Sequence, residues 1–338
     1  IFLSRIPPSA AVNSAVAMAK RKAGHSAAFV NALLRKLCDE AESGLPEVEG
    51  EDEIVRLSVT YSHPTWLVQR FSDMLGLAET EALLRENNAQ TPIYAAVNTL
   101  RTDAQALISR IESDGARAEP NSEPGMLELS ATGDIARLPS FARGEFFVQD
   151  PAALRAARLC GASSGDTVID VCAAPGGKSF ALALDMKDKG KIHAFDREAR
   201  VPAIREGAAR LGITCVEARA WDASAVFSEL EGSADIVLCD VPCSGLGVIR
   251  KKPEIRYKTR EEIAGMPEIQ RGILRAARKY VKPGGTLVYS TCTLLPEENG
   301  EIISRFLSEN PDFSLDFEET LYPHRDGTDG FYMARMRR

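Results

Sequence analysis

The segment that decides the fold spans residues 167–178 and reads TVIDVCAAPGGK. Its first residues favour a β-strand, and the small residues and paired glycines that follow favour a tight turn into a helix. Such a turn lets the backbone approach a bound ligand closely, and the start of the helix presents unpaired N–H groups. Alone this is a weak signal, and it does not match the dinucleotide-binding pattern G-x-G-x-x-G.

Strand-like and helical segments alternate around this turn, from about residue 150 onward. The predicted strands span residues 167–173, 191–196, 214–220, 234–240 and 286–292. This alternation predicts an α/β fold of the doubly wound, Rossmann-like kind, in which a mostly parallel sheet carries helices on both faces. Residues 314–317 and 331–336 are predicted to add an antiparallel edge.

The N-terminal half has a different pattern of predicted elements. Residues 1–42 and 53–86 show helical spacing of apolar residues, and the polar, acidic stretch between them, residues 43–53, is typical of a linker. A strand over 93–100, a helix over 102–114 and short strands over 116–118, 126–129 and 146–148 are then predicted. They indicate a small α+β module placed before the parallel sheet.

The composition is that of an ordinary globular protein. Of the 338 residues 44% are apolar and 26% charged, which gives room for two or three domains. No apolar run approaches the ~20 residues that span a bilayer, so we expect no membrane partner. The seven cysteines include no C-x-x-C pair and the four histidines are scattered, so we expect neither a disulfide framework nor a metal site. A reducing, cytoplasmic location is the default, and because the chain begins with Ile we expect further residues upstream.

The net charge of −7 does not indicate a nucleic-acid-binding protein, but the charge is uneven. Residues 250–260 carry six positive charges against one negative, and they directly follow a cysteine motif. Such a patch suits contact with phosphates, although a solvated charged loop would look the same. The candidate RNA-binding residues are Arg250, Lys251, Lys252, Arg256 and Lys258.

Three aspartates follow predicted strands. Asp196 ends the second strand about 20 residues beyond the glycines, where a carboxylate can accept hydrogen bonds from ribose hydroxyls. Asp222 follows the third strand and Asp240 ends the fourth. Asp196 or Asp222 alone could be a loop residue or a helix cap, but the register of these two relative to the glycine-rich turn favours ligand binding.

Two cysteines follow the fourth and fifth strands, Cys243 in DVPC and Cys292 in STCT. If these strands are neighbours they lie ~4.8 Å apart, and both thiols face one pocket.

The turn at 170–178 is of the S-adenosylmethionine type. A methyl donor beside two thiols suggests transfer to carbon 5 of a pyrimidine, which becomes reactive once a thiolate adds to carbon 6. Either thiol could attack. A free thiol is only about 3% ionised at pH 7, so the catalytic one needs positive charge nearby, from Lys178 or the basic run. The other cysteines (Cys38, Cys160, Cys215 and Cys239) are expected to be structural.

Together these motifs resemble the RNA (cytosine-5)-methyltransferases, most closely the bacterial RsmB type that modifies small-subunit (16S) ribosomal RNA. The most specific matches are DVPCSGLGVIR at 240–250 and YSTCT at 289–293. FVNALLR at 29–35, HPTW at 63–66, VQDP at 148–151 and DGFY at 329–332 extend the resemblance over nearly the whole chain.

The resemblance implies a class I methyltransferase domain over 146–338, a connecting RNA-binding module over 53–145 and a NusB-like helical remnant over 1–45. Compared with the NusB-like domain of the family, the helical domain of this chain looks truncated, so we expect its affinity for RNA to be incomplete. S-adenosylmethionine is the implied cofactor, RNA the implied partner, and the protein is expected to be a monomer.

The resemblance also implies roles for single residues. Cys292 would attack carbon 6, Cys243 would assist removal of the carbon 5 proton, and Lys178 and Asp240 would hold the cytosine ring. Asp196 would bind the ribose of the cofactor, Asp222 would lie near its adenine, and Asp240 would lie beside the methyl donor. The implied cofactor cradle consists of Cys172, Ala173, Ala174, Pro175, Gly176, Gly177 and Lys178.

Other interpretations remain open. The motifs do not separate ribosomal RNA from transfer RNA or another RNA as substrate, although the NusB-like helices favour the ribosomal one. DNA cytosine-5 methyltransferases place their nucleophile in a Pro-Cys motif like Pro242-Cys243, but the RNA family uses the Thr-Cys-Thr, which favours Cys292. An amino-group methyltransferase is disfavoured because DVPC stands where an Asn/Asp-Pro-Pro-aromatic motif would be. A non-catalytic RNA-binding or ribosome-assembly module is the least favoured.

Overall fold

The structure is a computed structural model, and it describes residues 6–41, 48 and 52–338. The chain divides into two compact units, residues 1–62 and residues 63–338. The predicted linker over 43–53 falls largely outside the described residues.

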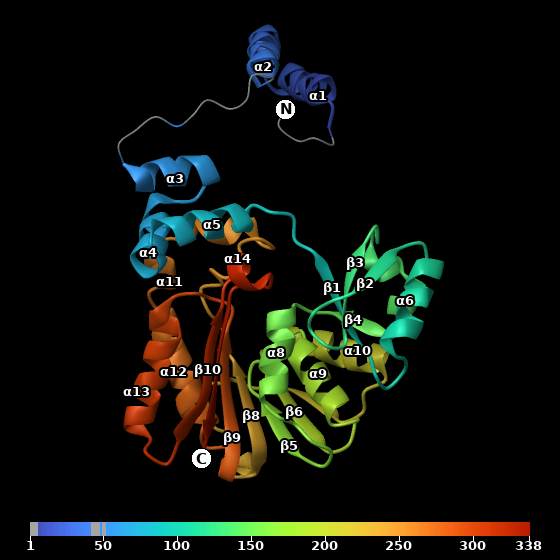
Figure 1. Cartoon of the computed structure of the whole chain (residues 1–338), viewed down its shortest axis with the longest axis vertical. Helices are drawn as coiled ribbons and strands as arrows, with labels where there is room; N and C mark the ends of the chain where they lie inside the picture. Colours follow the sequence, from blue (N-terminus) through green and yellow to red (C-terminus); the bar gives the residue numbers. More distant parts are fainter. Residues whose placement is uncertain (1–5, 42–47, 49–51) are drawn as a thin grey trace. The chain divides into compact units, whose positions relative to one another are not determined.

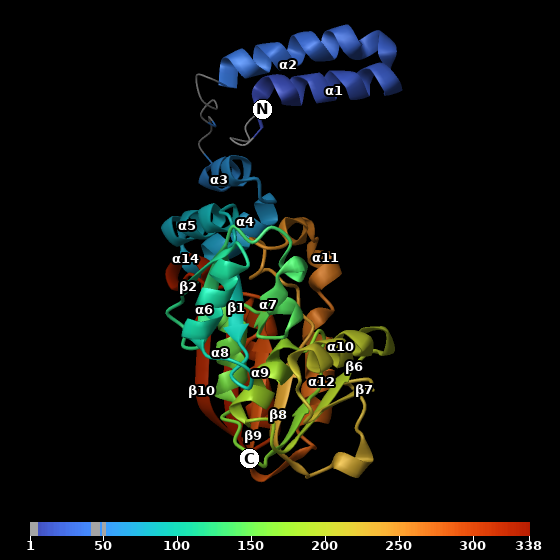
Figure 2. The ribbon, with the colours of Figure 1, turned by 90° about the vertical axis from the view of Figure 1, so that its right-hand side faces the viewer.

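The first unit is helical. Helices α1 (Pro8–Lys22) and α2 (Ala27–Ala41) are joined by the short turn η1 (Gly24–Ser26) and lie side by side, as Figure 2 shows. In this pair only Val12 and Ala27 are buried, whereas Phe29 and Leu33 of α2 are exposed. The unit also contains α3 (Glu53–Tyr61), whose N-cap Asp52 accepts the backbone N–H groups of Ile54 and Val55.

The helical stretch predicted over 53–86 is divided into three helices. After α3 the chain continues as α4 (Thr65–Leu75) and α5 (Leu77–Asn87). The breaks fall at Ser62, which has a positive φ of 56°, and at Gly76, with φ 81°. A positive φ cannot be part of a right-handed helix, and Gly adopts it without steric cost.

The predicted α+β module forms a four-stranded antiparallel sheet in the order β2-β3-β1-β4. Its strands are β1 (Ile93–Val97), β2 (Arg117–Pro120), β3 (Met126–Ser130) and β4 (Phe146–Val148). Helix α6 (Ala104–Ser113) packs Leu107 and Ile111 onto one face of this sheet, where both are fully buried.

The main sheet has seven strands in the order β10-β11-β9-β8-β5-β6-β7. The five predicted strands appear as β5 (Thr167–Asp170), β6 (Lys191–Asp196), β7 (Val216–Ala220), β8 (Ala234–Asp240) and β9 (Val281–Thr291), all parallel. The predicted antiparallel edge is formed by β10 (Ser314–Leu321) and β11 (Phe331–Arg337). The predicted α/β fold class is therefore confirmed.

Helices cover both faces of this sheet (Figure 1). On one face lie α8 (Pro151–Leu159), α9 (Gly177–Asp185) and α10 (Val201–Leu211), packed on Val168, Ile192 and Ile236. On the other lie α12 (Met266–Ala277) and α13 (Gly300–Glu309), packed on Ile169, Val237 and Leu287. Because neighbouring residues of a strand face opposite ways, Val168 and Ile169 serve different faces. The remaining short elements are η2 (Ile135–Arg137), α7 (Pro139–Ala142), η3 (Glu198–Arg200), η4 (Ser228–Leu230), η5 (Pro253–Tyr257), α11 (Arg260–Ile263), η6 (Pro296–Glu298) and α14 (Pro323–Asp326).

The topology determines where a ligand can bind. From β5 the chain builds outward to β6 and β7, then returns to β8 on the other side of β5. In open parallel sheets ligands bind beyond the carboxyl ends of the strands, at such a switch point. The glycine-rich turn after β5 and both cysteine motifs lie at this edge.

Candidate active site

The two cysteine motifs lie side by side because their strands are neighbours. Strands β8 and β9 pair in parallel, with Asp240 opposite Ser290. The loops that follow carry Cys243 and Cys292, whose Sγ atoms lie 3.3 Å apart although 49 residues separate them in sequence. The expectation that both thiols face one pocket is thus met by the geometry.

A buried polar network holds the two loops in this position. The hydroxyls of Ser244 and Thr293, each next to a cysteine, are 2.7 Å apart. Glu298 Oε2 accepts hydrogen bonds from the backbone N–H of Ser244 at 2.9 Å and from Gln270 Nε2 at 2.8 Å. Gln270 Nε2 also donates to the carbonyl of Pro242. Because Ser244, Gln270, Thr293 and Glu298 are buried, the loss of one side chain would leave its buried partners unsatisfied.

The two thiols are electrostatically unequal. The hydrogen bond from the Cys243 thiol lowers the pKa of Cys292, and the positive charge of Lys178 adds to this, against burial and the charge of Asp240. The same hydrogen bond, together with burial, raises the pKa of Cys243 well above its usual value. Burial also raises the pKa of Cys172, the third thiol of the region. Cys292 is therefore the thiol that ionises first.

Lys178 and Asp240 form an ion pair beside the thiols. Lys178 lies in the first turn of α9, and its Nζ donates to Asp240 Oδ2 at 2.6 Å. Ser290 Oγ donates to the other carboxylate oxygen at 2.8 Å. Burial opposes charge on Lys178, but the neighbouring Asp240 carboxylate outweighs it and raises the pKa of Lys178. The ammonium group is therefore kept charged next to Cys292.

A cavity of about 1120 Å³ opens at this edge of the sheet, and both cysteines and Asp240 line it. Asp196 and Asp222 line it from the ends of β6 and β7. Of the predicted cradle, Cys172 and Ala174 line the cavity, whereas Ala173 is buried beneath it and Gly177 begins α9. Asp196 Oδ2 accepts the backbone N–H of Ala174 at 2.8 Å, which ties the turn to β6.

The polar groups that line this cavity fit S-adenosylmethionine. Carboxylates at the ends of successive strands can accept hydrogen bonds from ribose hydroxyls and an amino group. Apolar side chains complete the wall, and they suit an adenine ring and an alkyl chain. They are Val171, Trp221, Val248, Ile255, Met266, Ile269 and Ile273. Except for Val171 and Val248, which stand in motifs quoted from the sequence, sequence reasoning missed them. Trp221 could have been predicted as a lining residue from the sequence, since it adjoins Asp222. The lining residues of α12 stand in no sequence motif that would have pointed to them.

The basic run after Cys243 is mostly engaged within the protein. Lys251 Nζ lies 2.6 Å from Asp150 and 2.7 Å from Asp329, and the Arg250 side chain is only 4% exposed and pairs with Glu86. Arg256 is buried and donates to Asn88, and Lys258 donates to the carbonyl of Ser244. Lys252 is exposed at the mouth of the cavity. The segment is thus less of a surface patch than its charge suggests, and its RNA contacts stay a prediction.

The sequence model of the family described as "16S rRNA methyltransferase RsmB/F" matches residues 158–337, more than half of the chain. The chain belongs to this family. S-adenosylmethionine is the cofactor of this class of methyltransferase. Two further models match the N-terminal half: the ferredoxin-like domain of RsmF/B-like methyltransferases over residues 63–136 and the NusB family over residues 1–39. The domain boundaries predicted from the sequence stay predictions.

Curated relatives extend the similarity over the full chain. The probable ribosomal RNA small subunit methyltransferase B of Bacillus subtilis is 38% identical over 100% of this chain and 80% of its own length. The ribosomal RNA small subunit methyltransferase B of Proteus mirabilis is 31% identical over 99% of this chain and 78% of its own length.

Solved structures share the fold of this chain. The crystal structure of PH0851 is 32% identical, with a TM-score of 0.82 over 95% of this chain and 75% of that chain. A methyltransferase homolog protein from Pyrococcus horikoshii is 26% identical, with a TM-score of 0.75 over 86% of this chain and 100% of that chain. Among the described residues, no helix is both long and apolar enough to cross a membrane. Within the same residues, no three His, Cys, Asp or Glu side chains are grouped so as to hold a metal ion.

Proposed function

We propose that this protein methylates carbon 5 of a cytosine in small-subunit (16S) ribosomal RNA through a covalent bond between Cys292 and the base. The 3.3 Å approach of two unequal thiols within the cofactor cavity carries this proposal. Transfer to an amino nitrogen needs no thiol, whereas carbon 5 is unreactive until a nucleophile adds to carbon 6. The names of the curated relatives support ribosomal RNA as the substrate.

The first step is addition of the Cys292 thiolate to carbon 6. A bond forms between sulfur and carbon 6, and the electrons of the C5=C6 double bond move through the ring toward N3 and O2, leaving an enamine. The Lys178 ammonium offsets this negative charge, and the Asp240 carboxylate accepts a hydrogen bond from the cytosine amino group. The base must leave its stack to reach the cavity.

When bound, S-adenosylmethionine supplies the electrophilic methyl group that carbon 5 of the thiol adduct accepts. Cys292 is then a neutral thioether, so the hydrogen bond that raised the pKa of Cys243 is gone. Cys243 can now lose its proton to solvent and take the proton from carbon 5. The sulfur–carbon 6 bond breaks, Cys292 leaves as a thiolate, and the original pair of one thiol and one thiolate is restored.

Ribosomal RNA incubated with labelled S-adenosylmethionine tests this order of events in three proteins: wild type, Cys243→Ala and Cys292→Ala. We expect transfer by the wild type, a denaturation-resistant protein–RNA adduct with Cys243→Ala, and neither transfer nor adduct with Cys292→Ala. An adduct that forms with Cys292→Ala but not with Cys243→Ala would make Cys243 the nucleophile.

The substrate is tested by the same assay with transfer RNA in place of ribosomal RNA. Transfer to transfer RNA alone would reject the ribosomal substrate and leave the chemistry intact. Cofactor binding without any transfer would leave a non-catalytic RNA-binding role. The cytoplasmic location expected from the sequence stays part of this proposal.

A further inference from the structure

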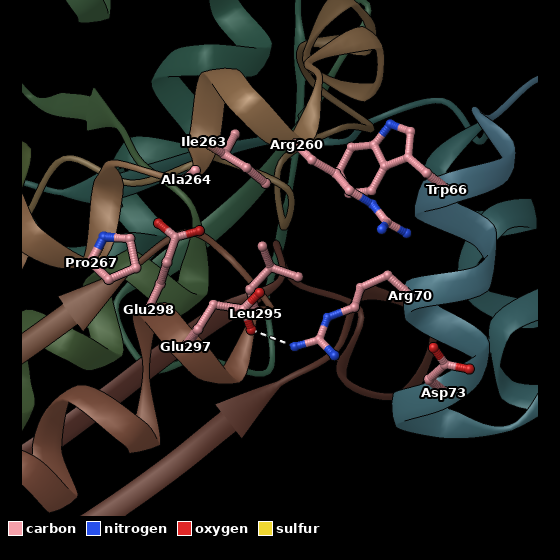
Figure 3. A pocket seen from close by; sticks show the side chains of 10 residues that line it. All are labelled: Trp66, Arg70, Asp73, Arg260, Ile263, Ala264, Pro267, Leu295, Glu297 and Glu298. Atoms are coloured by element: carbon pink, nitrogen blue, oxygen red, sulfur yellow. Dashed lines mark hydrogen bonds and ion pairs between the residues drawn. The ribbon is translucent and has the colours of Figure 1, made fainter.

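A second cavity, of about 420 Å³, lies within residues 63–338 and is not part of the site described above. Its walls, shown in Figure 3, come from α4, from the corner between α11 and α12, and from η6. We call it the Trp66 pocket. Its lining residues are Trp66, Arg70, Asp73, Arg260, Ile263, Ala264, Pro267, Leu295, Glu297 and Glu298.

One wall of the Trp66 pocket is an aromatic platform with a guanidinium group above it. Trp66, Arg70 and Asp73 follow each other at helical spacing and therefore share one face of α4. The Arg260 guanidinium reaches over from α11 and lies 5.7 Å from the centre of the Trp66 ring. Indole rings and guanidinium planes are the side chains on which unstacked RNA bases pack.

The opposite wall offers a hydrogen-bond acceptor without a donor. Glu298 is 1% exposed, and its Oε2 is used by Ser244 and Gln270. Its Oε1 is buried and has no hydrogen-bond partner among the described residues. A buried carboxylate oxygen left unsatisfied is costly, so a ligand that brings an N–H group to it gains affinity.

The charges of the pocket favour a base over a phosphate. Its two arginines face three carboxylates, and Arg70 is already paired with Glu297, as the dashed line in Figure 3 shows. A phosphate group would meet net negative charge here. A base carrying an amino group meets a flat platform and a carboxylate acceptor, and a cavity of this size lies within the range of small-ligand sites.

The Trp66 pocket and the catalytic cavity are lined by neighbouring residues of the same segments, although no residue lines both. Met266 and Ile269 of α12 line the catalytic cavity, whereas Pro267 between them lines the Trp66 pocket. Glu298 binds the backbone directly after Cys243, and Leu295 follows Cys292 by three residues. An RNA strand whose target base enters the catalytic cavity therefore passes close to the Trp66 pocket.

We propose that the Trp66 pocket binds a second base of the RNA substrate, one that flanks the target cytosine and carries an amino group. The base stacks on Trp66 beside Arg260 and donates to Glu298 Oε1. This inference rests on the proposed function, because it takes RNA as the substrate. It makes the pocket a determinant of which cytosine is chosen.

A double-mutant cycle between protein and RNA tests the proposal. The RNA is the shortest ribosomal RNA fragment that the wild type binds, with each nucleotide replaced in turn by an abasic one. Dissociation constants are measured for wild type, Trp66→Leu and Trp66→Phe. We expect one abasic position to weaken binding to the wild type by about 5- to 100-fold, as loss of one stacked base does.

In Trp66→Leu the same abasic replacement is expected to cost several-fold less than in the wild type, because the stacking is already lost and only the hydrogen bond to Glu298 remains to be removed. Trp66→Phe keeps most of the effect. Arg260→Ala, an exposed position, repeats the test if Trp66→Leu fails to fold. The proposal would be overturned if the loss of binding free energy from Trp66→Leu simply added to the loss from every abasic replacement. Unchanged RNA binding by Trp66→Leu would overturn it as well. Because binding is measured without turnover, a failure of the proposed methylation is seen separately, as absent transfer by the wild type.

Discussion

Gly247 and Gly330 lie back to back at the base of the Cys292 loop. The N–H of Gly330 donates to the carbonyl of Gly247 at 2.8 Å, and the N–H of Gly247 donates to the carbonyl of Cys292 at 2.9 Å. A Cβ atom added to Gly247 would lie 2.0 Å from the Gly330 carbonyl oxygen. The two backbones can approach only because neither residue has a side chain, and this approach fixes the nucleophile loop.

Gly247→Ala is therefore expected to displace the Cys292 loop. We expect a loss of stability of about 1 to 3 kcal/mol, the usual effect of overpacking, and at least a tenfold loss of methyl transfer. Denaturant unfolding and the transfer assay measure the two effects. Gly265→Ala is the matched control, because nothing lies within 4 Å of its added Cβ. Equal behaviour of the two variants would rule out the close approach as a constraint.

The hydrogen bond between the thiols predicts how the reactivity of Cys292 depends on pH. The pKa of Cys292 is lowered, so its thiolate is already formed below the usual thiol range and alkylation should reach its plateau at a lower pH than for an ordinary cysteine. Cys243→Ala removes the donor and should move this titration to higher pH. Cys243→Ser keeps a donor and should move it less. The measurement is the rate of iodoacetamide labelling of Cys292 against pH, and an unchanged titration in Cys243→Ala would contradict the assignment.

Asp170 gives a prediction about stability. Burial raises its pKa to about 7, against a donated hydrogen bond from Ser179, so the folded protein binds this proton more tightly than the unfolded chain does. The protonated Asp170 carboxyl therefore contributes its full stabilisation below pH 4, and this contribution is lost as the pH rises to about 7.

Asp170→Asn removes this titration while keeping an acceptor for Ser179. Relative to wild type, the variant should gain on the order of 2 to 4 kcal/mol in unfolding free energy between pH 4 and pH 7.5, since a pKa difference of one corresponds to about 1.4 kcal/mol. Urea unfolding at the two pH values measures it. Parallel pH profiles of the two proteins would show that Asp170 is ionised in the folded state without penalty.

Neighbouring lysines of the basic run are predicted to have different roles. Lys251→Ala leaves the Asp150 and Asp329 carboxylates buried side by side without their cation, and burial beside Asp150 already raises the pKa of Asp329 to about 6. We expect this variant to lose a few kcal/mol of stability. Lys252→Ala should leave stability unchanged and weaken RNA binding. The slope of the logarithm of the RNA-binding constant against the logarithm of the salt concentration should become shallower by about one. Thermal unfolding and RNA binding at several salt concentrations separate the two, and a destabilised Lys252→Ala would contradict the assignment.

Much of the fold was readable in the sequence because each element has a local cause. The strands from Thr167 to Thr291 carry their own apolar runs, and the turn into α9 carries its own glycines. Alternation along the chain then implies parallel pairing. The sequence predicts one helical stretch over 53–86, whereas the structure has three helices, because the breaks at Ser62 and Gly76 each depend on a single backbone angle.

The parallel strands, the glycine-rich turn after β5 and the two cysteine motifs can be read from the sequence alone, since each is a short pattern with a local physical cause. Which thiol ionises first depends on the tertiary structure, because Lys178 reaches Cys292 from α9 and Cys243 reaches it from the loop after β8. The packing of distant segments also pairs Lys251 with Asp150 and Asp329, and it brings Trp66 and Arg260 together in one pocket. Charge and aromatic character are properties of a residue, but their partners are set by how distant segments pack.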